Sequence, residues 1–137
     1  MIPETLARLA VVRAYRDLSD FARHGVGNSN SGEGARERIE EARRLRVLAN
    51  ELVDLVVLSE VLAGTSWQVI AQALNRRDAE MVQREYAEAV TEWRAVPAEA
   101  YEGIDGDARD FDTWYRAHCD DSDPVAENPA SDLLQAD

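Results

Sequence analysis

The sequence predicts an all-α protein folded as a helical bundle, and three observations support this fold class. Apolar residues recur three or four positions apart in two long segments, 5–23 and 35–63, as on one face of a helix. No segment of useful length alternates between apolar and polar residues, so the sequence predicts no β-strand. Glycine, asparagine and proline stand where helices are expected to begin or end.

Composition is typical of a soluble globular protein. The 137 residues suffice for one self-contained domain, and 45% of them are apolar and 31% charged. No apolar run approaches the roughly 18–20 residues of a membrane span, and the N-terminal residues do not resemble a secretion signal. A single cysteine, Cys119, excludes an intramolecular disulfide and suits a reducing compartment. We therefore expect a cytoplasmic protein.

The net charge of −12 is distributed unevenly along the chain. Residues 1–94 contain 13 arginines and 15 acidic residues, whereas residues 95–137 contain 2 arginines and 12 acidic residues. Nucleic acids favour a basic surface, so the total charge argues against such a partner. Because the acidity belongs to the C-terminal third, the first two thirds can still carry a local basic patch.

The first predicted helix covers residues 5–23, where Leu6, Ala10, Ala14 and Leu18 are spaced four apart. A flexible loop with four glycines, HGVGNSNSGEG, follows it. A phosphate-binding loop is the other interpretation of these glycines. It is disfavoured because the Lys-Ser/Thr ending is missing and no strand precedes the loop.

The longest predicted helix covers residues 35–63. Leucines with three-four spacing form a stripe along it, Ser59 occupies the remaining slot, and valines widen the stripe. The leucines are Leu45, Leu48, Leu52, Leu55 and Leu62. One interpretation is a central buried helix, and another is a homodimer interface along part of this helix. The two interpretations are compatible, so both stay open.

Two shorter helices are expected after residue 63. Gly64 stands where a left-handed residue ends the long helix, and Thr65 with Gln68 forms a capping box for the next one. Asn75 suits a left-handed turn position, and Asp78 can cap the helix that follows. The apolar residues of these helices are Trp67, Ile70, Ala71 and Leu74, then Val82, Tyr86, Ala89, Val90 and Trp93.

Two short helices joined by a tight turn and held by a long preceding helix form a helix-turn-helix unit. We expect this unit at residues 65–93, where Pro97 stops the last helix. The sequence thus predicts a helical domain over residues 1–97 that contains the helix-turn-helix.

The segment ARRLRVLANELVDLVVLSEVLAGTSWQVIAQALNRRDAEMVQREY resembles a group of small actinobacterial helix-turn-helix proteins. These proteins pair a long lead-in helix with a G-x-S-W-x-x-I-x-x-A-L segment, a turn and a recognition helix that ends in Q-R-[FY]. The resemblance covers about residues 42–93 and implies DNA binding, usually in transcriptional control. The matching residues are Gly64, Ser66, Trp67, Ile70, Ala73 and Leu74.

The chain departs from this pattern around the turn. Asn75 and Arg76 replace a glycine and an apolar residue, and an Arg-Asp-Ala-Glu run replaces the Ser-Arg-Gln that opens the recognition helix. The turn is also one residue longer if Val82 rather than Met81 is the buried residue. These differences bear on base recognition more than on the fold.

The first functional hypothesis is a DNA-binding protein, a small transcriptional regulator whose partner is double-stranded DNA. Residues near the start of the last helix would then meet base edges in the major groove, and the candidates are Arg77, Gln83 and Arg84. Arg76 would contact a flanking phosphate. The alternative is that these arginines pair on a solvated face with Asp78, Glu80 and Glu88.

The second functional hypothesis is a protein-interaction or regulatory module. The acidic segment 98–119 carries Phe111, Trp114 and Tyr115 at helical spacing, so residues 107–119 are expected to form one amphipathic helix. Its aromatic side chains could dock on the helical domain or bind a protein partner. Residues 120–137 are expected to be disordered, and the acidic tail could compete with DNA for Arg76 and Arg77.

The sequence offers no catalytic constellation, so we expect a protein that is not an enzyme and needs no cofactor. His118 and Cys119 are neighbours in the chain and do not form a spatially assembled base and nucleophile. The acidic residues of segment 105–112 are not in register with the loop glycine and final glutamate of a calcium-binding EF-hand. We therefore expect no metal site.

Overall fold

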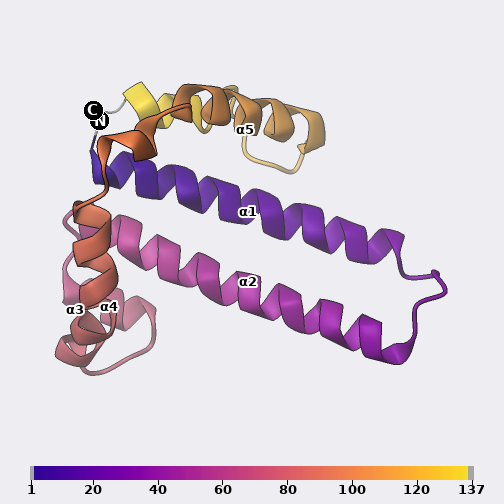
Figure 1. The fold of residues 1–137 in the computed structure, drawn as a ribbon, viewed down its shortest axis with the longest axis horizontal. Helices are drawn as coiled ribbons and strands as arrows, with labels where there is room; N and C mark the ends of the chain where they lie inside the picture. Colours follow the sequence, from indigo (N-terminus) through magenta and orange to yellow (C-terminus); the bar gives the residue numbers. More distant parts are fainter. Residues whose placement is uncertain (1, 136–137) are drawn as a thin grey trace.

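A computed structural model describes residues 2–135 of the chain. Within that range the chain forms α-helices and short 3₁₀ helices and no β-strand, which confirms the predicted all-α class (Figure 1). None of the helices in this range is both long and apolar enough to span a membrane.

Two long helices form an antiparallel hairpin that runs the length of the molecule (Figure 1). α1 covers Pro3–Gly27 and α2 covers Ala35–Leu62, so the predicted helix over 35–63 is confirmed to within one residue. Pro3 lies in the first turn of α1, where its missing N–H is not needed. Leu45, Leu48 and Leu55 of the leucine stripe line small cavities together with residues of α1. These three leucines are therefore covered within the chain.

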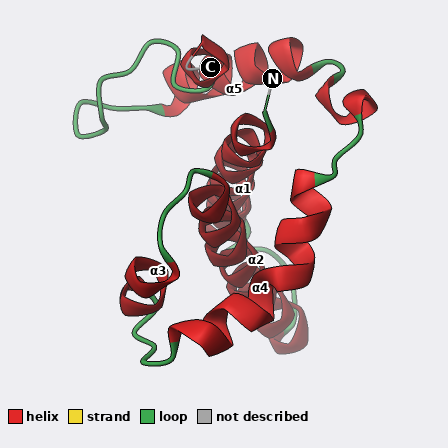
Figure 2. Cartoon of the chain, turned by 90° about the vertical axis from the view of Figure 1, so that its left-hand side faces the viewer, coloured by secondary structure: helices red, strands yellow, loops and turns green. Residues whose placement is uncertain are grey.

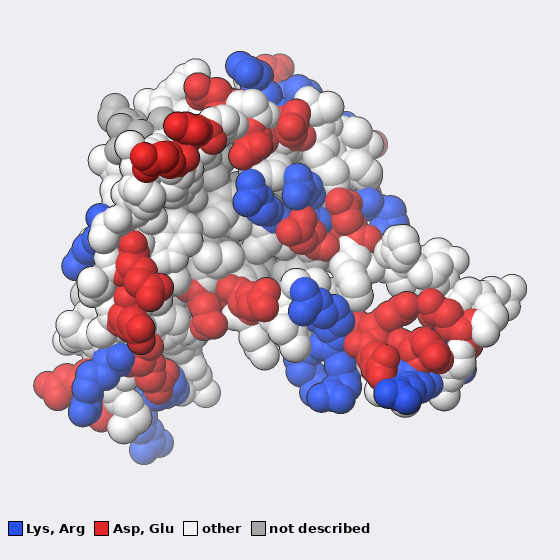
Figure 3. Space-filling view, viewed as in Figure 1, with Lys and Arg blue, Asp and Glu red and all other residues white. Residues whose placement is uncertain are grey.

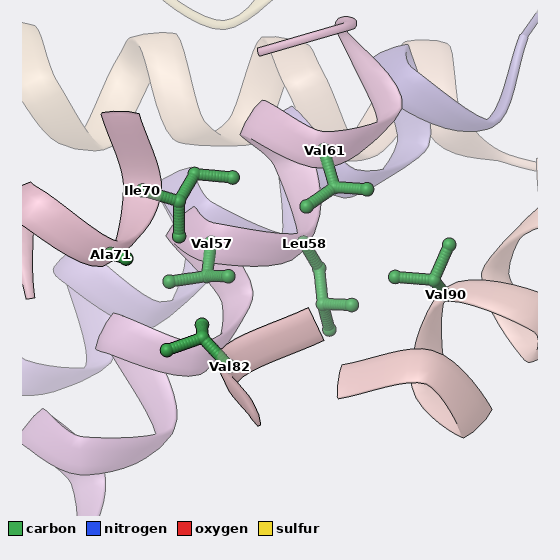
Figure 4. Close-up of a cluster of buried hydrophobic side chains, with 7 residues drawn as sticks. All are labelled: Val57, Leu58, Val61, Ile70, Ala71, Val82 and Val90. Carbon is green, nitrogen blue, oxygen red and sulfur yellow. The ribbon is translucent and has the colours of Figure 1, made fainter. Parts of the chain in front are cut away.

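Two shorter helices pack against the C-terminal half of α2. α3 covers Trp67–Ala73 and α4 covers Ala79–Arg94. Their apolar faces meet α2 in a core cluster, and Figure 4 shows its side chains converging from the three helices. The cluster consists of Val57, Leu58, Val61, Ile70, Ala71, Val82 and Val90.

The C-terminal part of the chain packs on the other side of α1. A 3₁₀ helix, η1 (Ala98–Tyr101), leads to α5 (Ile104–His118), and a second one, η2 (Ser131–Gln135), follows. α1 therefore lies between α2 and α5, as Figure 1 and Figure 2 show from two directions. A second core cluster holds these parts together and consists of Leu9, Ile104, Ala108, Phe111 and Ala130.

α5 begins three residues before the predicted helix over 107–119. Gly103 precedes it with φ 76°, a left-handed conformation that glycine adopts without strain. Ile104 is then already helical and buried in the second core cluster. Asp105 and Asp107 lie in the first turn, where negative side chains suit the positive end of the helix dipole.

Ala130, Leu133 and Leu134 of the predicted disordered tail pack against α1 and α5, whereas residues 120–125 are exposed. Asp112 is only 1% exposed and accepts hydrogen bonds from the backbone N–H of Ala130 at 2.7 Å and of Ser131 at 3.3 Å. The Ser131 hydroxyl also donates to this carboxylate. A buried acceptor thus anchors a segment that composition alone assigns to the disordered class. Residues 136–137 of the predicted tail lie outside the described residues.

Candidate functional site

The turn after α2 sets the direction in which α3 leaves the hairpin. Gly64 has φ 96°, which a side chain would strain, as the sequence predicts. The N–H of Gly64 donates to the Val61 carbonyl and the N–H of Thr65 to the Glu60 carbonyl, both at 3.0 Å. This pair of bonds is the Schellman arrangement, which satisfies carbonyls that the helix end leaves without partners.

The turn after α3 repeats this arrangement with asparagine in place of glycine. Asn75 has φ 59°, so the predicted left-handed turn residue is confirmed. Its N–H donates to the Gln72 carbonyl at 3.0 Å, and the N–H of Arg76 donates to the Ala71 carbonyl at 2.8 Å. Both turns that position α4 relative to α2 are therefore closed by specific backbone bonds.

The first turns of α3 and α4 are capped by side chains. The Ser66 hydroxyl accepts from the Val69 N–H at 3.3 Å, so the predicted capping box at Thr65 and Gln68 is wrong by one residue. The Thr65 hydroxyl instead donates to Glu60 Oε2 at 2.8 Å. Asp78 accepts from the Met81 N–H at 3.1 Å and caps α4 as predicted.

The register of α4 is decided by which of two neighbouring residues enters the core. Val82 is completely buried, whereas the side chain of Met81 is 47% exposed. Because Val82 rather than Met81 is buried, the turn between α3 and α4 is one residue longer than in the pattern that the sequence resembles. We call residues 67–94 the α3–α4 unit.

Tyr86 ties α4 to both α2 and α3. Its hydroxyl donates a hydrogen bond to Asp54 Oδ1 at 2.7 Å, and its ring stacks on that of Trp67 with centroids 6.3 Å apart. Burial, followed by the adjacent Asp54 carboxylate, raises the pKa of Tyr86 from 10.0 to about 12. The three helices of the site thus meet at one side chain.

This pKa shift predicts a loss of stability at high pH. The unfolded chain releases the Tyr86 proton near pH 10.0 and the folded chain only near pH 12, so this contribution is complete below 10 and disappears toward 12. Tyr86→Phe should remove that pH dependence and lower the free energy of unfolding by about 1 kcal/mol at neutral pH. The loss is modest because the hydrogen bond to Asp54 is accessible to water, which screens it. Urea unfolding across this pH range measures both effects. Tyr15→Phe, at a half-exposed tyrosine, is the control, and equal behaviour of the two variants would contradict the assignment.

Arg76 is held by an ion pair within the unit. Its guanidinium donates to both carboxylate oxygens of Glu85, at 2.8 and 3.2 Å. The hydrogen bonds from Arg76 lower the pKa of Glu85, as expected for a paired carboxylate. The sequence proposes Arg76 as a phosphate contact, and this pair neutralises it in the structure. Sequence reasoning did not find the pair because its members are nine residues apart, outside the helical three-four spacing.

Arg77, Gln83 and Arg84 are exposed at the beginning of α4, as a DNA contact requires. Among the described residues, no ion pair joins Arg77 or Arg84 to an acidic side chain, so the predicted alternative pairs with Asp78, Glu80 and Glu88 do not form. The three side chains nevertheless share this surface with exposed glutamates of α4. Figure 3 shows arginine and acidic side chains intermingled at this end of the molecule.

Two arginines that the sequence analysis did not single out lie farther along α2. Arg43 and Arg44 are exposed and make no ion pair within the described residues. Arg43 precedes Val61 by 18 residues, which is five helical turns, so both lie on the same side of α2. Val61 packs against the α3–α4 unit. In the sequence these arginines are visible as the run ARRLRV. The run points to a DNA contact only when the side of α2 that faces α3 and α4 is known.

The aromatic residues of α5 are engaged within the chain. Phe111 is 3% exposed, and the guanidinium groups of Arg13 and Arg16 lie over its ring, the nearer at 4.8 Å. Trp114 Nε1 donates to Asp20 Oδ1 at 2.9 Å, and the Tyr115 hydroxyl donates to the Pro124 carbonyl. The side chains that the sequence offers to a protein partner therefore fasten α5 to α1 and to the segment after α5.

The acidic segment lies away from the start of α4. α5 covers α1 on one side of the hairpin, while α3 and the beginning of α4 lie beyond α2 (Figure 1 and Figure 2). Within the described part of the chain, no acidic residue of segment 98–135 forms an ion pair with Arg76 or Arg77. Comparison of the chain with protein-family models, with curated proteins and with solved structures gives no match.

Proposed function

We propose that this chain is a DNA-binding protein, a small transcriptional regulator that reads double-stranded DNA with the α3–α4 unit as a helix-turn-helix. The observation that carries the proposal is the distribution of unpaired arginines. All four arginines of α1 are in ion pairs, namely Arg8, Arg13, Arg16 and Arg23. The arginines without an ion pair among the described residues include Arg43 and Arg44 on α2, Arg77 just before α4 and Arg84 in α4. The others are Arg38, Arg46, Arg94, Arg109 and Arg116.

The beginning of α4 offers the groups that a DNA reader needs. Arg77 directly precedes the capped end of the helix, where the helix dipole attracts anions. Gln83 and Arg84 follow within its first two turns and are free to contact base edges, since glutamine pairs with adenine and arginine with guanine in the major groove. Arg76, bound by Glu85, then serves to hold the turn rather than a phosphate.

The arginines of α2 supply a second contact. Arg43 lies on the side of α2 that carries the α3–α4 unit, roughly 27 Å along the helix from Val61. A duplex that lies against α4 can therefore meet Arg43 and Arg44 with its phosphates, which strengthens binding without selecting a sequence.

Glu80 and Glu88 flank Arg84 on the exposed side of α4 and oppose the phosphate backbone. We therefore expect weak binding to mixed-sequence DNA and a clear gain on Glu80→Gln, which keeps the side-chain length and removes a negative charge. The gain should be larger at low salt than at physiological salt, because surface charges are screened within about 8 Å at the latter.

The test is a fluorescence anisotropy titration of a labelled mixed-sequence duplex with the full chain at several salt concentrations. Arg84→Ala should weaken binding by about 5- to 150-fold if it reads a base, and less if it contacts only phosphate. Arg43→Ala should weaken binding to all DNA sequences alike. It should also reduce the slope of log affinity against log salt concentration by about 1. Arg109→Ala, at another exposed and unpaired arginine but on α5, is the matched control and should change nothing.

Two results would refute the proposal. The first is the absence of salt-sensitive binding by the full chain even at low salt, since counterion release is unavoidable when arginines contact phosphates. The second is an equal loss of affinity for Arg84→Ala and Arg109→Ala, which would mean that the α3–α4 unit is not the contact surface.

A further inference from the structure

α2 carries a second stripe with three-four spacing beside its leucine stripe. The leucine stripe lines cavities shared with α1. The residues of the second stripe are spaced alternately four and three apart, as in a coiled-coil heptad, and are Ala42, Arg46, Ala49, Val53, Val56 and Glu60. All of them except Val56, which is half-buried, are exposed, and Val53 retains 46% of its accessible surface. Ala42 also lines a cavity shared with α1, so the part of the stripe that is left to water among the described residues consists of Arg46, Ala49, Val53 and Glu60.

The second stripe borders an apolar groove between α1, α2 and α3. The groove has a volume of about 270 Å³, and Tyr15, Val53 and Ala73 line it from the three helices. Glu60 is the one charged residue among those that line it. Tyr15, one of its lining residues, is 57% exposed. An apolar surface contributed by three helices is unusual for a face that stays in water.

The opposite face of the hairpin has a different character. The cavity between α1 and α2 on that side is lined by Arg13, Asp17 and Glu51 as well as by apolar residues. Charged side chains of both signs are suited to solvent, whereas the apolar groove offers only Glu60 to water. The two faces of one hairpin are therefore built for different surroundings.

We propose that a second copy of this chain covers the second stripe and its groove, with the two α2 helices antiparallel about a two-fold axis near Val53. Arg46 and Glu60 each lie seven residues from Val53, in opposite directions along the same stripe. The antiparallel arrangement therefore brings Arg46 of each copy close to Glu60 of the other. A parallel arrangement would place like charges together, which opposes association.

The charges of the stripe are available for this pairing. Neither Arg46 nor Glu60 makes an ion pair among the described residues, and Glu60 accepts a hydrogen bond only from the Thr65 hydroxyl. Ala42 and Ala49 are small enough to let two helix backbones approach closely. The heptad spacing favours a left-handed crossing of about 20°, and with α1 of each copy the interface becomes a four-helix arrangement. The proposal specifies which part of the helix over 35–63 forms the homodimer interface that the sequence leaves open, and of the leucine stripe Leu52 lines the groove.

The dimer does not rest on the proposed function, since neither Arg77 nor Arg43 belongs to the second stripe or lines its groove. If the chain does bind DNA, the two-fold axis supplies two α3–α4 units for a two-fold symmetric site. Mass measurement without DNA therefore tests the dimer alone. DNA titration of a monomeric variant tests DNA binding by the α3–α4 unit alone.

The experiment is a charge-swap series on the full chain, followed by sedimentation equilibrium. The natural chain is expected to have twice its monomer mass of 15.3 kDa. Arg46→Glu and Glu60→Arg should each weaken dimerisation at least about tenfold, because each replaces two attractive contacts by two repulsive ones. The double variant should regain the natural affinity. Glu51→Arg, on the opposite face, is the control and should leave the dimer unchanged.

A cross-linking measurement gives an independent reading of the axis. In a Cys119→Ser background, Val53→Cys should form an interchain disulfide under mild oxidation, because the axis brings the two residues together, whereas Glu51→Cys should not. A monomeric natural chain, a dimer that none of the swaps weakens, or failure of the double variant to recover would each overturn the proposal.

Discussion

Val82→Asp is expected to release α3 and α4 from α2, whereas the same replacement at the neighbouring Met81 should leave the fold intact. Val82 is completely buried in the core cluster of the α3–α4 unit, and no cationic side chain belongs to that cluster. An unpaired carboxylate at such a position costs about 3–5 kcal/mol, against a total stability of about 5–15 kcal/mol for a typical domain. At Met81, which is 47% exposed, the new carboxylate remains in water.

Urea unfolding followed by circular dichroism measures this difference, and the fluorescence of Trp67 and Trp93 reports on the same unit. The pair of variants tests the register of α4, because a shift by one residue would exchange the two roles. Equal destabilisation by the two substitutions would show that this register is incorrect. Val82→Ala, which only removes two methyl groups, should fall between the aspartate variant and the natural chain.

Asp112→Ala is expected to free the segment 120–135 and to cost about 3 kcal/mol. The substitution leaves the N–H groups of Ala130 and Ser131 without their acceptor, and a buried unsatisfied donor costs about 1–3 kcal/mol. The Ser131 hydroxyl loses the same partner. Since Ala130 is fully buried beside Phe111, release of the segment also opens the second core cluster.

Hydrogen exchange of the Ala130 and Ser131 amides tests this prediction directly, because protection should be lost there before it is lost in α2. Asp110→Ala, at an exposed position of the same helix, is the matched control and should leave both amides protected. Asp112→Asn keeps one acceptor oxygen and is expected to lie between the two. If the two amides exchange freely in the natural chain, the segment is not anchored by Asp112.

The elements and their ends were predictable where local rules decide them. The helix over 35–63 follows from apolar spacing, and the positions of Gly64 and Asn75 follow from the left-handed backbone that each turn requires. Asp78 was identified as a cap because its hydrogen-bond donor, the Met81 N–H, lies only three residues farther along the chain. The cap of α3 was misplaced since Thr65 and Ser66 are adjacent and equally suited, and only the contact of Thr65 with Glu60 separates them.

The features that could not be predicted from the sequence depend on contacts between residues far apart in the chain. Arg76 and Glu85 are brought together by the turn, and Asp112 meets Ala130 across a loop of irregular structure. Composition predicts disorder for residues 120–135 because the segment is rich in charged residues and proline. It cannot show that the Asp112 carboxylate accepts hydrogen bonds from the N–H groups of Ala130 and Ser131. The same limit applies to Phe111, which is covered by arginines of α1.

The candidate site was predictable in part. Exposure of Arg77, Gln83 and Arg84 agrees with their proposed role, while their contact with DNA stays a prediction. The contribution of Arg43 required knowing which side of α2 carries α3 and α4. Likewise, the valines of α2 looked like a broadening of the leucine stripe. In the structure Val57 and Val61 pack against α3 and α4, whereas Val53 and Val56 line the groove beside the leucine stripe.

The packing of the first helix against residues near the C-terminus has a consequence for synthesis on the ribosome. Leu9 and Ala130 share a core cluster although they are 121 residues apart in the chain. At about 5–20 residues per second, roughly 6–24 s separate the translation of these two residues. Until α5 and Ala130 have been translated, the side of α1 that carries Leu9 lacks all or part of its cover, even when α2, α3 and α4 have already packed. Chains that terminate early therefore keep an open apolar strip, and we expect them to aggregate or to be degraded rather than to accumulate as folded fragments.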